Sequence, residues 1–224
     1  MPSSNNKSMV GNLSCHYSDN PVLRALLQLV PYWGCADTLL EHRAAEIRSD
    51  RIRVFFEELA NGTRALTEEI IQEEDFLHNF FCTLKAAINT RHREKIRLFA
   101  RLLSSSISPA TGSTTDEFEE LLGILDDISL REFIALNELA KFEIQNISKE
   151  SENKLEHCLH YWEQFRTTII QKLSINEEIF NSFMAKIERT GLYFRLTNGF
   201  MDYRGNVGET TPLFKRLLEL VSSN

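Results

Sequence analysis

Glycine and proline are scarce in this sequence, which has nine Gly and five Pro among its 224 residues. A sheet-rich fold with many tight turns uses more of both, so the composition argues against a β-sandwich or barrel. A long apolar run is also lacking, because the most apolar region, 22–40, contains Arg24, Pro31 and Asp37. A spanning helix needs about 20 mostly apolar residues. We therefore expect a mainly α-helical protein that does not cross a membrane.

The four cysteines are widely scattered, and none belongs to a C-x-x-C pair. Neither a disulfide framework nor a zinc site is indicated by this spacing. The first residues are polar and lack the apolar core of a signal peptide. We expect a cytoplasmic protein with a disordered tip at 1–19.

Motifs for catalysis or cofactor binding are also lacking: there is no G-x-S-x-G elbow and no glycine-rich phosphate loop. The nearest metal-ligand spacings are two pairs, His78 with Cys82 and His157 with His160. A zinc site needs at least three protein ligands, so each pair is incomplete. We expect no enzyme activity, no cofactor, no metal and no small-molecule substrate.

Positive charge is concentrated in one segment, although the formal net charge of the chain is −7. The basic side chains of this segment are Arg91, Arg93, Lys95 and Arg97. A nucleic acid or an acidic partner could bind them. Alternatively, they neutralise the acidic residues of 68–75 across the surface of a helical bundle, which is the more common outcome for opposed charge blocks.

Composition and helix signals divide the chain into segments. Apolar residues at helical spacing predict a bundle over 20–107, with Asn20 capping its first helix and Pro21 at the first helical position. Ser, Thr, Gly and Pro dominate 104–115, and we place a linker at 108–115. A second helical domain is expected over 116–224.

Three sequence patterns mark the helices of this second domain. Ser129 with Glu132, and Ser174 with Glu177, have the spacing of capping boxes that open helices. Between them, 151–173 is strongly amphipathic, and its apolar residues recur at three- and four-residue steps. The expected core residues of this segment are Leu155, Cys158, Leu159, Trp162, Phe165, Ile169 and Leu173.

A hairpin is predicted after the helix that opens at Ser174. That helix carries Ile179, Phe180, Phe183 and Ile187 as its apolar stripe and should stop at Gly191. The segment 192–197 has strand character, and Asn198-Gly199 favours a two-residue turn. We expect a returning strand at 200–203, a loop over 205–209, and a last helix opened by Thr211 and Pro212.

This order of a helix ending in Gly191-Leu192, a hairpin and a final helix resembles the second half of a winged-helix domain. The resemblance covers about 128–221 and implies that the helix opened at Ser174 is the recognition helix. The helix over 151–173 departs from the pattern, because it is about twice the length of the usual middle helix. The N-terminal half resembles, more vaguely, uncharacterised bacterial helical proteins, some associated with prophages and anti-phage defence, through 34–37, 51–55 and 94–100. No functional residue carries over from that second resemblance.

Two functions from different classes follow from these expectations. The first is a non-enzymatic protein-interaction or regulatory adaptor, with a protein partner or a second copy of the chain. The alternative is a DNA-binding regulator that uses the C-terminal module, although two carboxylates, Glu177 and Glu188, on the expected recognition helix oppose a phosphate backbone. The basic candidates for DNA or partner contact in this module are Lys186, Arg189, Arg195 and Arg204. A lesser alternative is a membrane-associated effector that uses the apolar segment at 21–40.

Overall fold

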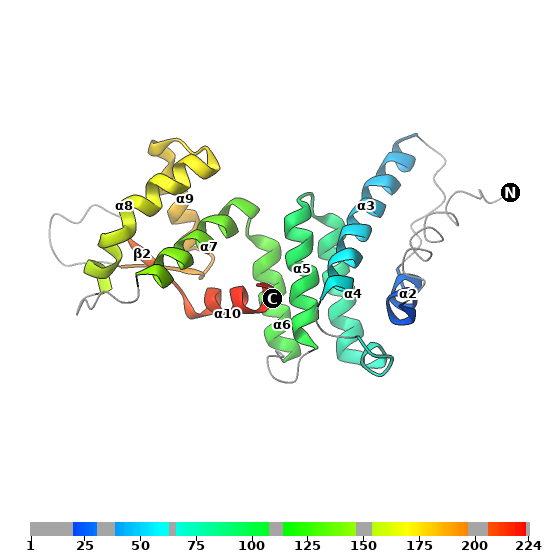
Figure 1. Ribbon diagram of the computed structural model, residues 1–224. Coiled ribbons are helices and arrows are strands. Elements are labelled where there is room, and N and C mark those ends of the chain that lie inside the picture. The colour runs from blue at the N-terminus through cyan, green and yellow to red at the C-terminus, as the bar shows by residue number, and fades with distance from the viewer. Residues whose placement is uncertain are drawn as a thin grey trace. The chain divides into compact units, whose positions relative to one another are not determined.

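The computed structural model describes residues 20–30, 39–62, 66–107, 114–146, 154–196 and 206–222. In these ranges the protein is mainly helical, with one two-stranded antiparallel sheet, as the composition predicted (Figure 1). The helices of the first half are α2 (Pro21–Gln28), α3 (Leu39–Asn61), the short 3-10 helix η1 (Ile70–Gln72), α4 (Glu74–Asn89), α5 (Arg93–Ser106) and α6 (Thr115–Asp127). The later elements are α7 (Leu130–Gln145), α8 (Lys154–Leu173), α9 (Glu177–Glu188), β1 (Tyr193–Arg195), β2 (Gly208–Thr210) and α10 (Pro212–Val221).

The chain forms two compact units, Met1–Leu125 with Leu220–Asn224, and Asp126–Glu219. The division therefore falls between Leu125 and Asp126, after the 108–115 connection that the sequence suggested. Most of α6 belongs to the first unit, and its apolar face, which includes Phe118, is buried. Of the expected linker, 108–113 lies outside the described residues, as does the tip at 1–19.

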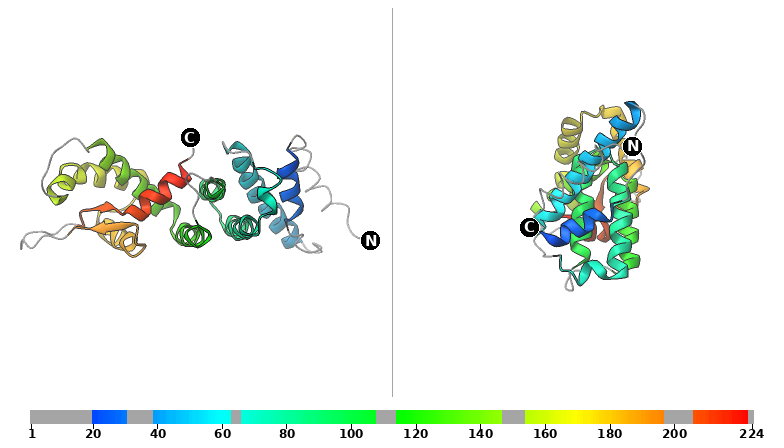
Figure 2. Two further views of the ribbon diagram at one scale, coloured as in Figure 1. Left: turned by 90° about the horizontal axis from the view of Figure 1, so that it is seen from below. Right: turned by 90° about the vertical axis from the view of Figure 1, so that its right-hand side faces the viewer.

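The first unit is a helical bundle in which α3, α4 and α5 pack against one another. Figure 2 shows α4, α5 and α6 side by side and nearly along their axes in its left view. The centre of this bundle is aromatic: the ring of Phe80 lies 6.4 Å from that of Phe55 and 6.2 Å from that of Phe56. All three side chains are fully buried. Their edge-to-face and tilted contacts are the geometries that aromatic pairs prefer.

The start of α2 is the predicted one. The Asn20 side-chain oxygen accepts hydrogen bonds from the backbone N–H groups of Val22 and Leu23, each at 3.1 Å. Pro21 occupies the first turn, where its missing N–H has no helical partner to lose. The apolar side chains of α2 are buried in the core, so its apolar face is occupied by packing. Among the described helices, none is long and apolar enough to cross a membrane.

The C-terminal end of α5 differs from the expected loop. Ser104, Ser105 and Ser106 are helical, although their composition suggested a loop from 104 onward. The Ser105 hydroxyl donates to the Leu102 carbonyl at 2.7 Å, and the Ser106 hydroxyl donates to the Leu103 carbonyl at 2.8 Å. Serine side chains can bond back to the preceding turn in this way, which lets polar residues end a helix.

The second unit confirms one predicted helix start and corrects another. Ser129 and Glu132 form a complete capping box at the start of α7. The expected box at Ser174 is wrong, because Ser174 has a φ of 50° and ends α8 instead. The Ile175 N–H donates to the Ile170 carbonyl, and the Ser174 N–H donates to the Gln171 carbonyl. These two bonds form a Schellman motif, which ends the helix. Asn176 is the residue that caps α9, accepting from the Glu178 amide at 3.3 Å.

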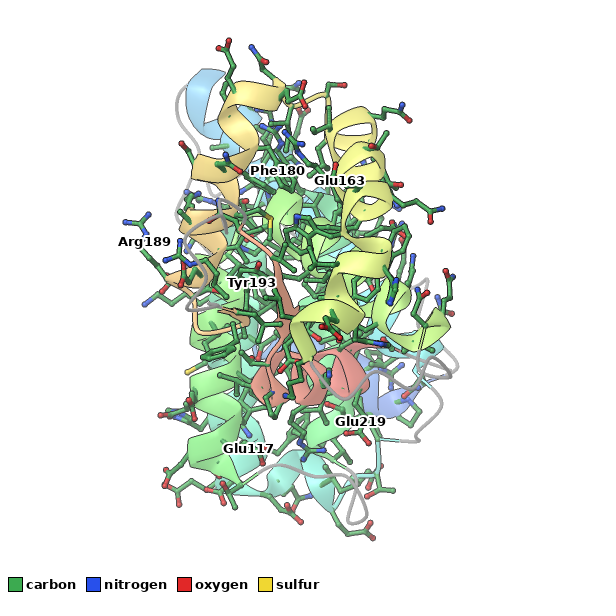
Figure 3. All side chains as sticks on the ribbon, turned by 90° about the vertical axis from the view of Figure 1, so that its left-hand side faces the viewer. Glu117, Glu163, Phe180, Arg189, Tyr193 and Glu219 are labelled. Atoms are coloured by element: carbon green, nitrogen blue, oxygen red, sulfur yellow. The ribbon has the colours of Figure 1, made fainter. Side chains whose placement is uncertain are left out.

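The core of the second unit lies between α7, α8, α9 and the sheet. Trp162 and Phe165 of α8 are 4% and 0% exposed, and their ring centroids lie 5.1 Å apart. Phe180 of α9 packs on both rings. Figure 3 shows Phe180 and Tyr193 beside α8, whereas Arg189 projects outward. The sequence therefore identified the main core residues of α8.

Four predicted core positions are corrected by the same packing. Leu159 of α8 is 50% exposed and Ile179 of α9 is 55% exposed, whereas Tyr161 and Met184 are buried in their helices. Leu173 and Phe183 are only partly buried. Each helix turns a narrower face to its neighbours than the full apolar stripe suggested, because the packing partner decides which apolar residues are covered.

The sheet pairs β1 with β2 in the register Tyr193 opposite Thr210, Phe194 opposite Glu209 and Arg195 opposite Gly208. The returning strand is therefore at Gly208–Thr210, where the sequence suggested a loop. Asn198, Gly199 and the expected strand at 200–203 lie outside the described residues.

Side-chain contacts explain why the strand forms at Gly208–Thr210. The Glu143 carboxylate of α7 accepts hydrogen bonds from the Thr210 amide and from the Thr210 hydroxyl, both at 2.6 Å. A Cβ atom at Gly208 would overlap the Phe194 carbonyl and the Tyr193 ring, so glycine is required for this close approach. After the strand, the Thr211 hydroxyl accepts from the Phe214 amide and caps α10, as predicted.

Candidate functional site

The basic segment at the start of α5 lies against the middle of α3. Thr90 ends α4 and His92 precedes α5, so Arg91 occupies the short turn between the two helices. On α3, Arg43, Ile47 and Arg51 follow one another at four-residue steps, which places them on one helix face. These two segments line a cleft of about 530 Å³. We call it the arginine cleft; it is lined by Arg43, Glu46, Ile47, Asp50, Arg51, Arg91 and Arg93.

The sequence identified only half of this cluster. Arg91 and Arg93 were candidates because they stand close together in the chain, whereas Arg43 and Arg51 come from a helix some 40 residues earlier. Their four-residue spacing was a visible signal, but a single sequence does not show which helix faces which. The packing of α3 on α5 is what brings the four side chains together.

Carboxylates hold several of these cations in place. Arg93 lies 2.8 Å from Asp50, and Arg53 lies 2.7 Å from the same carboxylate. The hydrogen bond from Arg53, with that from Arg93, lowers the pKa of Asp50 despite its partial burial. Asp50 is therefore charged at neutral pH and ties the start of α5 to α3.

The other two basic candidates of this segment do not line the cleft. Arg97 lies 3.7 Å from Glu58, which also accepts a hydrogen bond from Arg101 at 2.6 Å. Lys95 is only 9% exposed, and its ammonium group lies 5.7 Å from the centre of the Phe99 ring. Cations of α5 thus pair with carboxylates of α3. Neutralisation of this kind across the bundle surface was one of the two interpretations of the basic segment, the other being contact with a nucleic acid or an acidic partner. The acidic partners of Arg93, Arg97 and Arg101 are Asp50 and Glu58 of α3, whereas the sequence suggested those of 68–75.

Two of the four basic candidates of the second unit contact carboxylates. Lys186 lies 3.0 Å from Glu132, which is 2% exposed, and Arg195 lies 3.8 Å from Glu188. Arg189 follows the last residue of α9 and is exposed. Arg204 lies outside the described residues.

The cysteine and histidine pairs have their own surroundings. His78 Nε2 lies 2.6 Å from Glu119 Oε1 and 3.6 Å from Cys82 Sγ, so one ring nitrogen faces both partners. Burial raises the pKa of the Cys158 thiol, which keeps it protonated at neutral pH and unsuited to act as a nucleophile. Within the described part of the chain, no group of three or more His, Cys, Asp or Glu side chains is arranged to hold a metal ion.

Comparisons with protein-family models, with curated proteins and with solved structures give no significant match to this chain.

Proposed function

We propose that this chain is a non-enzymatic protein-interaction or regulatory adaptor, and that α9 and β1 of the second unit contribute a contact surface for a protein partner. One observation carries the proposal. Lys186 and Arg195, the cations of these elements that a phosphate backbone would need, already pair with Glu132 and Glu188. A nucleic acid would have to displace those carboxylates.

Apolar side chains on the same two elements support a protein partner. Ile179 of α9 is 55% exposed and Phe194 of β1 is 59% exposed. The two elements pack against each other. Large apolar and aromatic side chains are typical of the buried centres of protein interfaces, whereas charged pairs typically lie at their rims.

The winged-helix resemblance is retained as part of this proposal. The order α7, α8, α9, β1 and β2 supports it, with α9 in the position of the recognition helix and the two strands in the position of the wing. Winged-helix folds serve both DNA and protein recognition, so the surface chemistry decides between them. Here the first turn of α9 carries Glu177 and Glu178, which disfavours a DNA backbone.

A partner-capture experiment tests the protein-interaction surface. The full chain, a double variant Ile179→Asp/Phe194→Asp and a control variant Ile144→Asp are used to capture proteins from the native host. Ile144 is 65% exposed near the end of α7, so the control makes the same type of change on a different element from α9 and β1. The proposal expects partners that the parent and the control retain and that the double variant loses. Identical capture by all three proteins, or self-association unaffected by the double variant, contradicts it.

DNA recognition is the second candidate, and the exposed Arg189 at the end of α9 is the observation that favours it. We expect no tight binding of the full chain to generic duplex DNA at physiological salt, measured by fluorescence anisotropy. Sub-micromolar binding that weakens steeply with added salt, and weakens again after substitution of Arg195 and Arg204 by Ala, would replace the adaptor with a DNA-binding regulator.

A further inference from the structure

The arginine cleft combines a cavity with an excess of positive charge. Its four guanidinium groups, from Arg43, Arg51, Arg91 and Arg93, stand against two carboxylates, Glu46 and Asp50, which leaves a local net charge of +2. The whole chain carries −7. A cationic cleft on an acidic protein concentrates anions locally, because field lines focus in concave surfaces.

Contacts within the described ranges use only a few of the N–H donors in the cleft. A guanidinium group offers five N–H donors in a planar fork. Arg51 uses one nitrogen to donate to the Ile88 carbonyl at 2.5 Å, which fixes this side chain between α3 and α4. Arg93 uses one nitrogen for Asp50, and Arg43 uses one for Glu46 at 2.9 Å.

The carboxylates of the cleft do not oppose an anion strongly. Asp50 is shared between Arg53 and Arg93, and Glu46 contacts Arg43. Arg91 is exposed in the turn before α5 and forms no ion pair with any side chain in the described ranges. It is therefore the guanidinium group that a ligand engages without displacing a carboxylate.

Size and local backbone geometry define the type of anion. A volume of about 530 Å³ lies within the range of small-molecule sites. Arginine forks bind phosphate oxygens in pairs, which favours a phosphoryl group over a simple halide. The α5 helix begins at Arg93, and its cap residue His92 makes no side-chain capping bond. The positive end of the helix dipole therefore lies beside the cleft, where Glu94 of the first turn offsets part of it.

We propose that the arginine cleft binds the phosphoryl group of a small phosphate-bearing molecule. The cleft belongs to the first unit, so the inference does not depend on the protein-interaction surface assigned to α9 and β1.

Isothermal titration of the full chain tests the proposal with three probes at matched ionic strength: inorganic phosphate, pyrophosphate and ATP. Binding of pyrophosphate at one site per chain is expected. If ATP binds no tighter than pyrophosphate, the phosphate groups alone account for binding. If ATP binds more tightly, the cleft also recognises the nucleoside. Both results support a phosphoryl site.

Variants locate the binding. Arg91→Ala is expected to weaken pyrophosphate binding by about tenfold or more, because it removes a charged hydrogen-bonding group. Arg189→Ala removes the same charge from an exposed position of the second unit and should leave the affinity unchanged. Circular dichroism of both variants checks that they fold. Absence of binding by all three probes, or equal weakening by the two substitutions, overturns the proposal.

Discussion

At the scale of single residues, Glu132 shows how a buried charge is stabilised. Its backbone N–H and side chain complete the capping box with Ser129, and its carboxylate also reaches Lys186 of α9. Burial by itself would raise the pKa of Glu132, but the hydrogen bonds from Ser129 and the ion pair with Lys186 outweigh it and hold the pKa below its usual value of 4.5. One side chain thus joins two helices and a helix start.

This arrangement predicts a pH-dependent stability. Because the pKa is lower in the folded state, the ionised form stabilises the fold above pH 4.5, and this contribution is lost as the pH falls below that value. Glu132→Gln should lower the free energy of unfolding by about 1–3 kcal/mol at pH 7, and by less under acid conditions. Urea unfolding at several pH values measures both. Glu163→Gln, at a carboxylate with 79% side-chain exposure, is the control and should change little; an equal effect of both substitutions contradicts the prediction.

Substitutions of two glycines by alanine are predicted to change the stability of the protein in opposite directions. Gly208→Ala would force a methyl group into the Phe194 carbonyl and the Tyr193 ring, and should destabilise the protein by about 1–3 kcal/mol or more. Gly123 lies in α6, and a Cβ added there has no atom within 4 Å. Gly123→Ala should therefore stabilise the protein by about 0.5–1 kcal/mol. Thermal unfolding of the two variants tests this pair. A stable Gly208→Ala protein would mean that β1 and β2 are not this close.

At the scale of elements, α8 shows what the sequence predicted and what it missed. The three- and four-residue spacing identified a helix and most of its buried face, because that face must meet a core wherever the neighbours lie. It did not separate Leu159 from Tyr161, since only the position of α7 decides which of them is covered: the ring of Tyr161 stacks on Phe142 of α7 at 6.2 Å. The register of β2 was missed for a similar reason, because Glu143 lies 67 residues before Thr210.

The two faces of α8 predict different costs of truncation. Trp162→Ala removes a ring that packs on Phe165, Phe180 and Tyr193, and should lower the free energy of unfolding by about 3–5 kcal/mol. Leu159→Ala on the exposed face should cost less than about 1 kcal/mol. Denaturant titrations of both variants compare them directly. Similar values for the two would show that this face of α8 is not the buried one.

At the scale of the whole molecule, the two compact units have separate cores. The first contains the Phe55, Phe56 and Phe80 cluster, and the second contains Trp162, Phe165 and Phe180. The sequence indicated two parts from the composition of 104–115. It did not assign α6 to the first unit, because an amphipathic helix shows that it has a core face but not which core it joins.

Separate cores predict separate local stabilities. In the Trp162→Ala protein, amide hydrogen exchange should increase across α7, α8 and α9, whereas α3, α4 and α5 keep the protection of the parent protein. Exchange followed by mass spectrometry resolves these segments. Phe80→Ala, which opens the first core, is the converse variant and should give the opposite pattern. Uniform loss of protection in either variant would show that the two units unfold as one.

The contact between Glu143 and Thr210 has a consequence for solubility. The Leu196 amide donates to the Val207 carbonyl, and the Thr211 amide donates to the Leu192 carbonyl. Hydrogen-bonded and non-hydrogen-bonded residue pairs alternate along antiparallel strands, so the Thr210 amide, which lies between these pairs, points away from β1. An outward amide on a short sheet is a template on which a strand from another molecule can add, which is a common route to aggregation. Because that amide already donates to Glu143, this position of β2 is closed to an incoming strand. The carboxylate thus protects the sheet edge against unwanted growth while it joins α7 to the strand.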